Sequence, residues 1–362
     1  MSAFLDGALR PRLGVTLGAI AFALVEIFAL CLVVSPDVVA RLEPGVLARN
    51  TDDDGAALTH ALVTAQRAPA RSSHVALVGA SSMREAIWHI DSLADTVAQD
   101  AGLAQGASTL SAFDLTSGGQ ALAESLAVLR ALPESQRGVV VLGIGPGTLF
   151  ADRDELQARF EHPISALAVD DMNALARALG MPERVSTGIY FLDHLQFFVS
   201  RPQVPVRLAV GALTLRRHRY LGRTPWTEAR WAERLDALRL DFARRAQDEA
   251  LVASHLAALE ETLTRLARDT RWRVVLIEPP LAPRARPTLA EARQAAHALI
   301  APLAERLRVP LVDLDTEARL VDADFHDFTH LRSEDAMRRY EARLAALIAQ
   351  TLDAARPAGG QP

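Results

Sequence analysis

Short apolar runs alternate with helix-like stretches from Ser72 to the last helix, and this pattern constrains the fold more than any other feature of the chain. The runs are HVALVG, SAFDL, GVVVLGIG, RWRVVLIEPP and VPLVDLD. They have the length of buried strands, and stretches with helical periodicity separate them. Strands that are apolar on both faces and alternate with helices form a parallel sheet covered by helices. We therefore predict an α/β fold.

The strand-like runs fall on both sides of an arginine-rich, mostly helical stretch at about 151–270. The later runs are too few to build a sheet of their own, so we predict one α/β domain at 71–355 with a helical insertion. Residues 356–362 are predicted to be a flexible tail.

A nearly uncharged run at 13–34 is long enough to cross a bilayer, for which about 20 apolar residues suffice. Arg10 and Arg12 precede it, so the positive-inside rule places residues 1–12 in the cytoplasm and the domain outside. We predict a single-pass inner-membrane protein with a periplasmic domain. A cleaved signal peptide is the alternative, although its apolar region would be shorter. Residues 35–70 are rich in turn formers and are predicted to be a juxtamembrane connector.

Glu26 lies in the middle of this apolar run, where a carboxylate usually faces a protein partner. A protonated carboxyl without a partner is the alternative.

The composition excludes several kinds of chemistry. A net charge of −5 argues against nucleic-acid binding. The chain has no lysine, which excludes Schiff-base chemistry, and its one cysteine, Cys31, cannot form an internal disulfide or a zinc cage. Neither a dinucleotide nor a P-loop motif is present. We predict no metal and no cofactor.

Ser81 follows the first strand-like run, in Gly79-Ala80-Ser81, where a turn passes into a helix. A hydroxyl there is exposed at the carboxyl edge of the sheet, and the helix N-terminus favours negative charge. The alternative is that Ser81 or Ser82 only caps the helix.

Asp327 and His330 are three residues apart, close enough for the carboxylate to hold one imidazole nitrogen while the other stays free. A histidine that activates a serine needs such an orienting carboxylate. The alternative is a capping aspartate beside a surface histidine. His326 is near enough to be confused with His330.

These motifs resemble those of the SGNH, or GDSL-type, hydrolases, which have Gly-x-Ser near the start of the domain and Asp-x-x-His near its end. The stretch FDLTSGGQALAES is similar to the second block of the family, and there Gly118 takes the place of a glycine whose N–H helps to form the oxyanion hole. Gly119 is the neighbouring alternative. The resemblance spans about 72–352 and implies a flavodoxin-like three-layer sandwich with Ser81, Asp327 and His330 as the catalytic residues.

The third block departs from the family. Its usual Gly-x-Asn-Asp supplies an asparagine that donates to the oxyanion, but this chain reads VVVLGIGPGTLF. Losing one such donor costs about 10²–10³ in rate. Either a backbone N–H of Gly145 or Gly147 replaces it, or turnover is slow, or catalysis is lost. We assign the oxyanion donors to Ser81, Gly118 and Gly145.

Arg84 completes Gly-x-Ser-x-x-Arg and is predicted to bind an anionic substrate group, pairing with Glu85 being the alternative. This pattern, the membrane span and the missing asparagine are similar to the SGNH-like proteins of alginate O-acetylation and teichoic-acid D-alanylation. That resemblance implies a polysaccharide or acyl-ester substrate and a polytopic membrane O-acyltransferase as partner.

We therefore expect a membrane-anchored serine esterase or acyltransferase that adds acetyl groups to an exported polysaccharide or removes them. Two alternatives remain open, a catalytically silent SGNH-like scaffold and a general periplasmic esterase or lipase.

Overall fold

The computed structural model describes residues 13–33, 54–70, 72–102, 110–161, 167, 169–195 and 218–353. Its centre is a five-stranded parallel sheet with the strand order β2-β1-β3-β4-β5. This is the flavodoxin-like order of doubly wound folds. The prediction of an α/β fold with a parallel sheet is confirmed. The strands are β1 (Ser73–Ala80), β2 (Leu110–Ser117), β3 (Arg137–Gly143), β4 (Arg271–Ile277) and β5 (Leu311–Val312).

The central strand β1 is buried on both faces, which explains its unbroken apolar sequence. Successive side chains of a strand point to opposite faces. Val75 and Leu77 accordingly enter one hydrophobic core, while Ala76 and Val78 enter the other. All four side chains are fully buried. The two cores lie on opposite faces of the sheet and make three layers.

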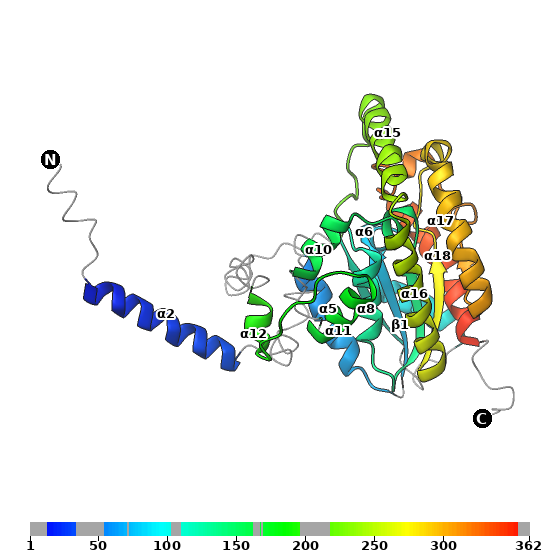
Figure 1. Cartoon of the computed structure of the whole chain (residues 1–362). Coiled ribbons are helices and arrows are strands. Elements are labelled where there is room, and N and C mark those ends of the chain that lie inside the picture. Colours follow the sequence, from blue (N-terminus) through cyan, green and yellow to red (C-terminus); the bar gives the residue numbers. More distant parts are fainter. Residues whose placement is uncertain are drawn as a thin grey trace.

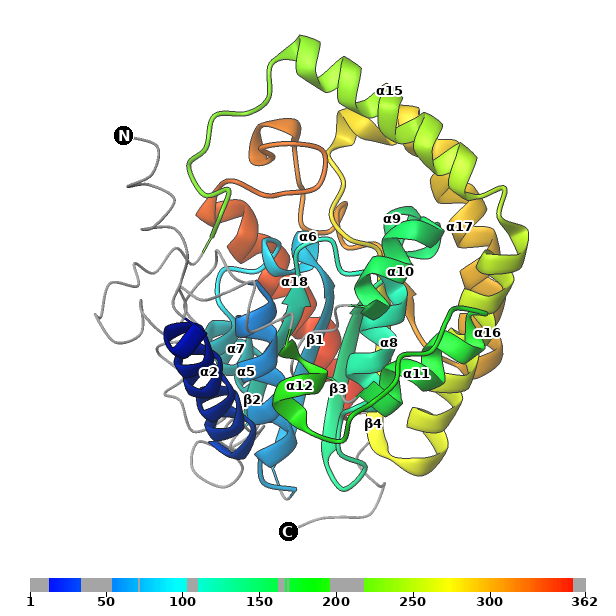
Figure 2. The same cartoon turned by 60° about the vertical axis from the view of Figure 1, so that its left-hand side comes forward.

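Helices cover both faces of the sheet, and Figure 2 shows α5, α8 and α16 on the near side with α18 behind the strands. The first face carries α5 (Asp54–Arg67), α8 (Leu122–Arg130) and α16 (Glu249–Asp269). The second face carries α7 (Ile90–Asp100), α18 (Glu334–Asp353) and part of α15 (Glu228–Arg245). The helix α17 (Arg286–Leu307) contributes to both cores.

The described helices between β3 and β4 are α9 (Pro146–Leu149), α10 (Arg153–Glu161), α11 (Val169–Ala178), α12 (Tyr190–Asp193), α15 and α16. All but α9 fall within the stretch at about 151–270 that was predicted to be an insertion. The last of them, α16, packs directly on α8 and β4. It therefore acts as an ordinary crossover helix of the sheet, and β4 and β5 join the same sheet as the early strands.

The predicted connector at 35–70 includes part of the core. Leu58, Leu62 and Ala65 lie on one face of α5 and are buried against the sheet. Turn-forming residues precede α5, and for that reason the whole stretch at 35–70 was predicted to be a connector. The domain thus starts earlier than the predicted residue 71, and residues 34–53 lie outside the described part of the chain.

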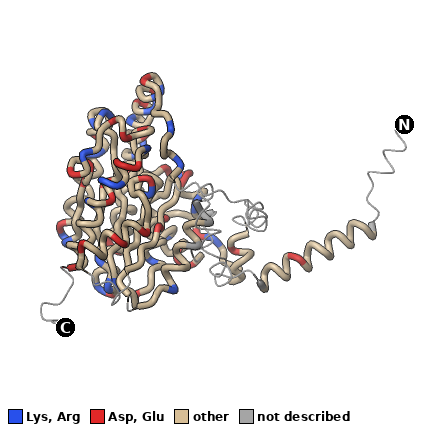
Figure 3. The backbone as a smooth tube through the Cα atoms, turned by 180° about the vertical axis from the view of Figure 1, so that it is seen from behind, with Lys and Arg blue, Asp and Glu red and all other residues tan. Residues whose placement is uncertain are grey.

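The helix α2 (Leu13–Val33) stands away from the layers of the domain (Figure 1). Within the described residues it is the one helix long and apolar enough to cross a membrane, and none of its central stretch, Gly14–Leu32, is buried. Charged residues cover the α/β layers but are nearly absent from α2 (Figure 3). By length and composition α2 fits either a membrane anchor or a signal sequence. Residues 1–12, with Arg10 and Arg12, and the tail from 354 lie outside the described residues.

A fully buried histidine in α16 makes the stability of the domain depend on pH. His255 forms a hydrogen bond to the Leu149 carbonyl at 3.2 Å through Nδ1, and burial lowers its pKa to about 4. Between pH 6.5 and 4 the unfolded chain therefore binds a proton that the folded chain does not. Stability is lost as pH falls through this window, by up to about 3 kcal/mol.

We expect His255→Asn to reduce this loss, because its amide can still donate to Leu149 but does not titrate. Chemical denaturation of the full chain at pH 7.5 and pH 5 measures the effect. The control is His297→Asn on α17, since its side chain is about half exposed. An equal loss of stability in the wild type and in His255→Asn would contradict the prediction.

Candidate active site

The carboxyl ends of β1, β2 and β3 meet at one edge of the sheet. The strand β1 lies between β2, which follows it in sequence, and β3, so the chain reverses direction across the sheet here. Doubly wound proteins bind ligands at such switch points. Figure 2 shows α6 (Ser81–Arg84) at this end of β1.

Ser81 is the first residue of α6, directly after β1. Gly79 has a φ of +140°, which side chains rarely adopt, and a Cβ there would lie 3.3 Å from Gly143 Cα. The turn that presents Ser81 therefore needs glycine at position 79. Ala80 occupies the N-cap position, and no side chain caps this helix. Ser81 is thus not a capping residue, which was the structural alternative for it.

His330 reaches Ser81 from the loop before α18. Its Nε2 lies 3.0 Å from Ser81 Oγ, although 249 residues separate the two. Its Nδ1 lies 2.8 Å from Asp327 Oδ2, and Asp327 Oδ1 also accepts the backbone N–H groups of Thr329 and His330, each at 2.9 Å. A bridge between Phe325 and Leu331 closes this loop. The structure therefore brings the three predicted catalytic residues into one hydrogen-bonded chain.

The charge of Asp327 fixes the tautomer of His330. Burial alone would raise the pKa of Asp327, but the hydrogen bond from His330, the imidazole charge and the two N–H groups together lower it. The ionised carboxylate accepts a hydrogen bond from the Nδ1–H group. Nε2 therefore carries no proton and can accept a hydrogen bond from the Ser81 hydroxyl. This is the arrangement in which a histidine acts as general base toward a serine.

Two of the three proposed oxyanion donors lie on neighbouring strand ends. Ala80 pairs with Ser117, so continuing the register by one residue places Gly118 beside Ser81. Gly118 and Gly119 are both exposed, and Gly119 has a φ of +62°, which makes it the turn residue of the pair. The assignment of the oxyanion donor to Gly118 stays a prediction.

The N–H group of Gly145, the third proposed oxyanion donor, already has a hydrogen-bond partner. It donates to Thr148 Oγ1 at 2.9 Å, and the same hydroxyl donates to the Gly145 carbonyl at 3.0 Å. The Gly145 N–H would reach an oxyanion only after leaving Thr148. This competition could not be predicted, because Thr148 belongs to a short helix whose start was not predicted.

Arg84 takes the structural alternative that the sequence left open. Its side chain is about nine-tenths buried, and its guanidinium lies 3.2 Å from Glu85 Oε1. The fully buried Glu85 also lies 3.5 Å from His218 Nδ1. Burial alone would raise the pKa of Glu85, but His218 and Arg84 together lower it, so the carboxylate stays charged. A role of Arg84 in substrate binding stays a prediction.

Two further residues support the site and were not singled out from the sequence. Gln120 is buried and its Oε1 accepts the Gly79 N–H at 2.9 Å, which fixes the turn before Ser81. The ring of Tyr220 stacks on the imidazole of His330, with 4.1 Å between centroids. Gln120 lies inside the second SGNH-like block but was given no role, whereas Tyr220 lies in the arginine-rich stretch, where no motif points to it.

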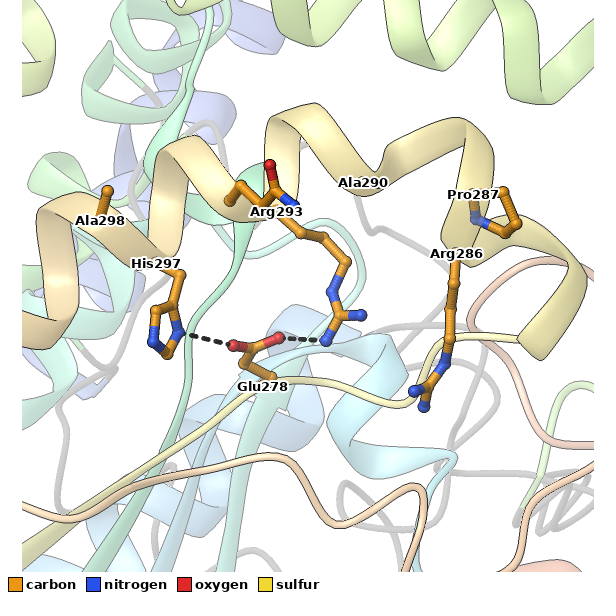
Figure 4. Close-up of a pocket in the computed structure, with 8 residues that line it drawn as sticks. Glu278, Arg286, Pro287, Ala290, Arg293, His297 and Ala298 are labelled. Atoms are coloured by element: carbon orange, nitrogen blue, oxygen red, sulfur yellow. Dashed lines mark hydrogen bonds and ion pairs between the residues drawn. The ribbon is translucent and has the colours of Figure 1, made fainter.

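A pocket that Ser81 does not line lies where α17 covers the end of β4 (Figure 4). Its charged side chains pair with one another: Arg293 contacts Glu278 and Asp313, and His297 lies 3.2 Å from Glu278. Within the described residues no group of three or more His, Cys, Asp or Glu side chains is arranged to hold a metal ion. We assign this pocket a structural role.

Comparisons with known proteins add little to the geometry. No family model matches the chain, and no curated protein matches it in sequence. The crystal structure of an extracellular lipase from Streptomyces rimosus is similar in structure, with a TM-score of 0.37 and 9% identity over 76% of this chain and 100% of the lipase chain. A likeness this weak carries no functional information. The fold and the hydrogen-bonded residues together define the class: a flavodoxin-like α/β protein with a serine, histidine and aspartate chain at its switch point.

Proposed function

We propose that the protein is a serine esterase or acyltransferase of the SGNH type. The observation that carries this proposal is the hydrogen-bonded chain from Ser81 Oγ through His330 to Asp327. Its place at the end of β1 agrees with the sequence motifs that resemble the SGNH family. Two distant parts of the sequence supply the three side chains, and their contact is what hydroxyl activation requires.

In the proposed mechanism Ser81 Oγ bonds to the carbonyl carbon of an acyl ester while its proton passes to His330 Nε2. Asp327 stabilises the imidazolium that forms. The N–H groups of Ser81 and Gly118 donate to the oxyanion, and Gly145 joins them if Thr148 releases it. The ester C–O bond then breaks, and the leaving alcohol takes the proton from His330. Water or a sugar hydroxyl attacks the acyl-serine by the same steps in reverse.

We further propose that the substrate is an exported or cell-wall polysaccharide carrying O-acetyl groups, and that α2 anchors the domain at the outer face of the inner membrane. The support is the Gly-x-Ser-x-x-Arg pattern, the apolar helix and the missing asparagine, which together resemble the polysaccharide-modifying SGNH-like proteins. In that setting Glu26 offers a polar contact for a membrane-embedded partner such as a polytopic O-acyltransferase.

A catalytically silent scaffold is the second candidate function. The observation that favours it is the hydrogen bond between the Gly145 N–H and Thr148, which leaves one fewer donor aimed at an oxyanion. On this alternative the same fold binds a glycan or organises a membrane complex without turnover.

The test uses the full chain, solubilised from membranes with detergent. Hydrolysis of p-nitrophenyl acetate without any partner supports an esterase. Loss of acetyl groups from an acetylated polysaccharide, or their transfer from the donor ester to an unacetylated one, measured by mass spectrometry, supports the polysaccharide substrate. Absence of both turnover and an acyl adduct would overturn the enzyme proposal in favour of the scaffold.

A further inference from the structure

We call residues 218–226 the cover segment. Its first residues contact the part of the chain that carries Ser81. His218 Nε2 lies 2.6 Å from the Trp88 carbonyl, and the two rings stack with centroids 5.2 Å apart. The Arg219 N–H donates to Glu85 Oε1 at 3.4 Å. Trp88 and Glu85 belong to the turn directly after α6, so this end of the cover segment is fixed close to Ser81.

The rest of the cover segment forms hydrogen bonds with the loop that carries His330. The Gly222 N–H donates to the Arg332 carbonyl at 2.9 Å, and Arg332 Nε donates back to the Arg223 carbonyl at 2.6 Å. The Trp226 N–H donates to the His326 carbonyl at 2.9 Å. The cover segment therefore joins the two parts of the chain whose alignment determines the distance between Ser81 and His330.

Tyr220 lies in the middle of the cover segment and covers one face of His330. The two rings are 4.1 Å apart between centroids and only 20° from parallel, and Tyr220 also lies 5.2 Å from the His326 ring. Asp327 holds Nδ1 and Ser81 faces Nε2. The imidazole is thus constrained at both nitrogens and against one face.

Two carboxylates act on the imidazole of His330. Asp327 lies at 2.8 Å, and the buried carboxylate of Glu85 acts on the same imidazole through space. A cation over an aromatic face is stabilised, so the Tyr220 ring would stabilise an imidazolium formed at His330. Two further groups face the same ring: the guanidinium of Arg223 lies 5.6 Å from its centroid, and His326, whose pKa is lowered by burial, lies at 5.2 Å.

We infer that Tyr220 is a positioning residue, which keeps the imidazole of His330 turned toward Ser81 and stabilises the imidazolium that forms when Ser81 loses its proton. This inference rests on the proposed function, because that function assigns the base to His330.

The first experiment measures the pKa of His330 without requiring turnover. Diethyl pyrocarbonate modifies neutral imidazole, so its rate at the His330 peptide, followed by mass spectrometry against pH, reports the pKa. Because Tyr220→Leu removes the ring that stabilises the cation, we expect the pKa of His330 to fall by about half to one unit. Tyr220→Phe keeps the ring and should match the wild type. Tyr220→Met is a second variant without the ring, in case the leucine variant does not fold.

The second experiment follows ester hydrolysis in the same variants. We expect Tyr220→Leu to lower kcat by about tenfold with KM unchanged, and the acidic limb of kcat/KM to move to lower pH, as the fall in the pKa of the base requires. The matched control is Tyr190→Leu, because Tyr190 packs on His194 at 4.6 Å in α12, away from Ser81.

The outcomes separate the two proposals. A His330 pKa and a pH profile in the Leu and Met variants equal to those of the wild type would overturn the role of Tyr220 and leave the proposed function standing. If the wild type turns over no ester, the proposed function fails, and the modification experiment still decides whether Tyr220 stabilises the charged form of His330.

Discussion

Replacing Ser81 with alanine is expected to reduce ester hydrolysis by about 10³- to 10⁶-fold, because no other group in the site can form the acyl intermediate. The hydroxyl lies 3.0 Å from His330 Nε2 and caps no helix, so its removal should cost the fold little. Initial rates with p-nitrophenyl acetate, together with thermal unfolding of the same preparation, measure both effects.

Ser82→Ala is the matched control for this substitution. Ser82 is the next residue and is buried, but it is not the hydroxyl that meets His330. We expect the control to keep most of the activity. Equal losses in the two variants would mean that the turn, and not the Ser81 hydroxyl, is what activity requires.

The second large effect is expected from Asp327→Asn, which should lower kcat by about 10⁴-fold with little change in KM. An asparagine can still accept the N–H groups of Thr329 and His330 through its oxygen, so the loop should keep its shape. Its NH₂ group, however, would face His330 Nδ1 and force the proton onto Nε2. In that tautomer His330 cannot accept the proton of Ser81.

Asp322→Asn controls for the loss of a nearby negative charge. Asp322 is exposed, accepts the Arg284 N–H at 2.9 Å and belongs to the turn before the His330 loop. Its substitution should leave kcat within about twofold of the wild type, as is usual for exposed residues far from the reacting atoms. If Asp327→Asn behaves like this control, the carboxylate does not orient the base.

The fold was predictable because its signal is local. The central strands β1 and β3 contain unbroken apolar runs, and apolar runs that alternate with helices indicate a parallel sheet. The relay from Ser81 to His330 was predictable because both motifs stand at strand or helix ends, which a parallel sheet brings to one edge. The face of α5 that enters the core was missed, since turn formers before it made the whole stretch look like a connector.

Contacts between segments that carry no motif could not be predicted. Tyr220 contacts His330 because the cover segment folds back over the loop that carries His330. The sequence around Tyr220 contains no motif that indicates this path. The pairing of Gly145 with Thr148 likewise depends on how a four-residue helix closes. Arg84 lies on the predicted turn, but only the structure shows that its charge is directed at Glu85.

Fluorophosphonate labelling of the full chain at neutral pH, located by peptide mass spectrometry, tests most directly whether Ser81 is an activated nucleophile. We expect a single adduct on Ser81, absent in Ser81→Ala and greatly slowed in His330→Ala. A wild-type protein that stays unlabelled, or one labelled at another residue, would contradict the assignment of Ser81 as the nucleophile.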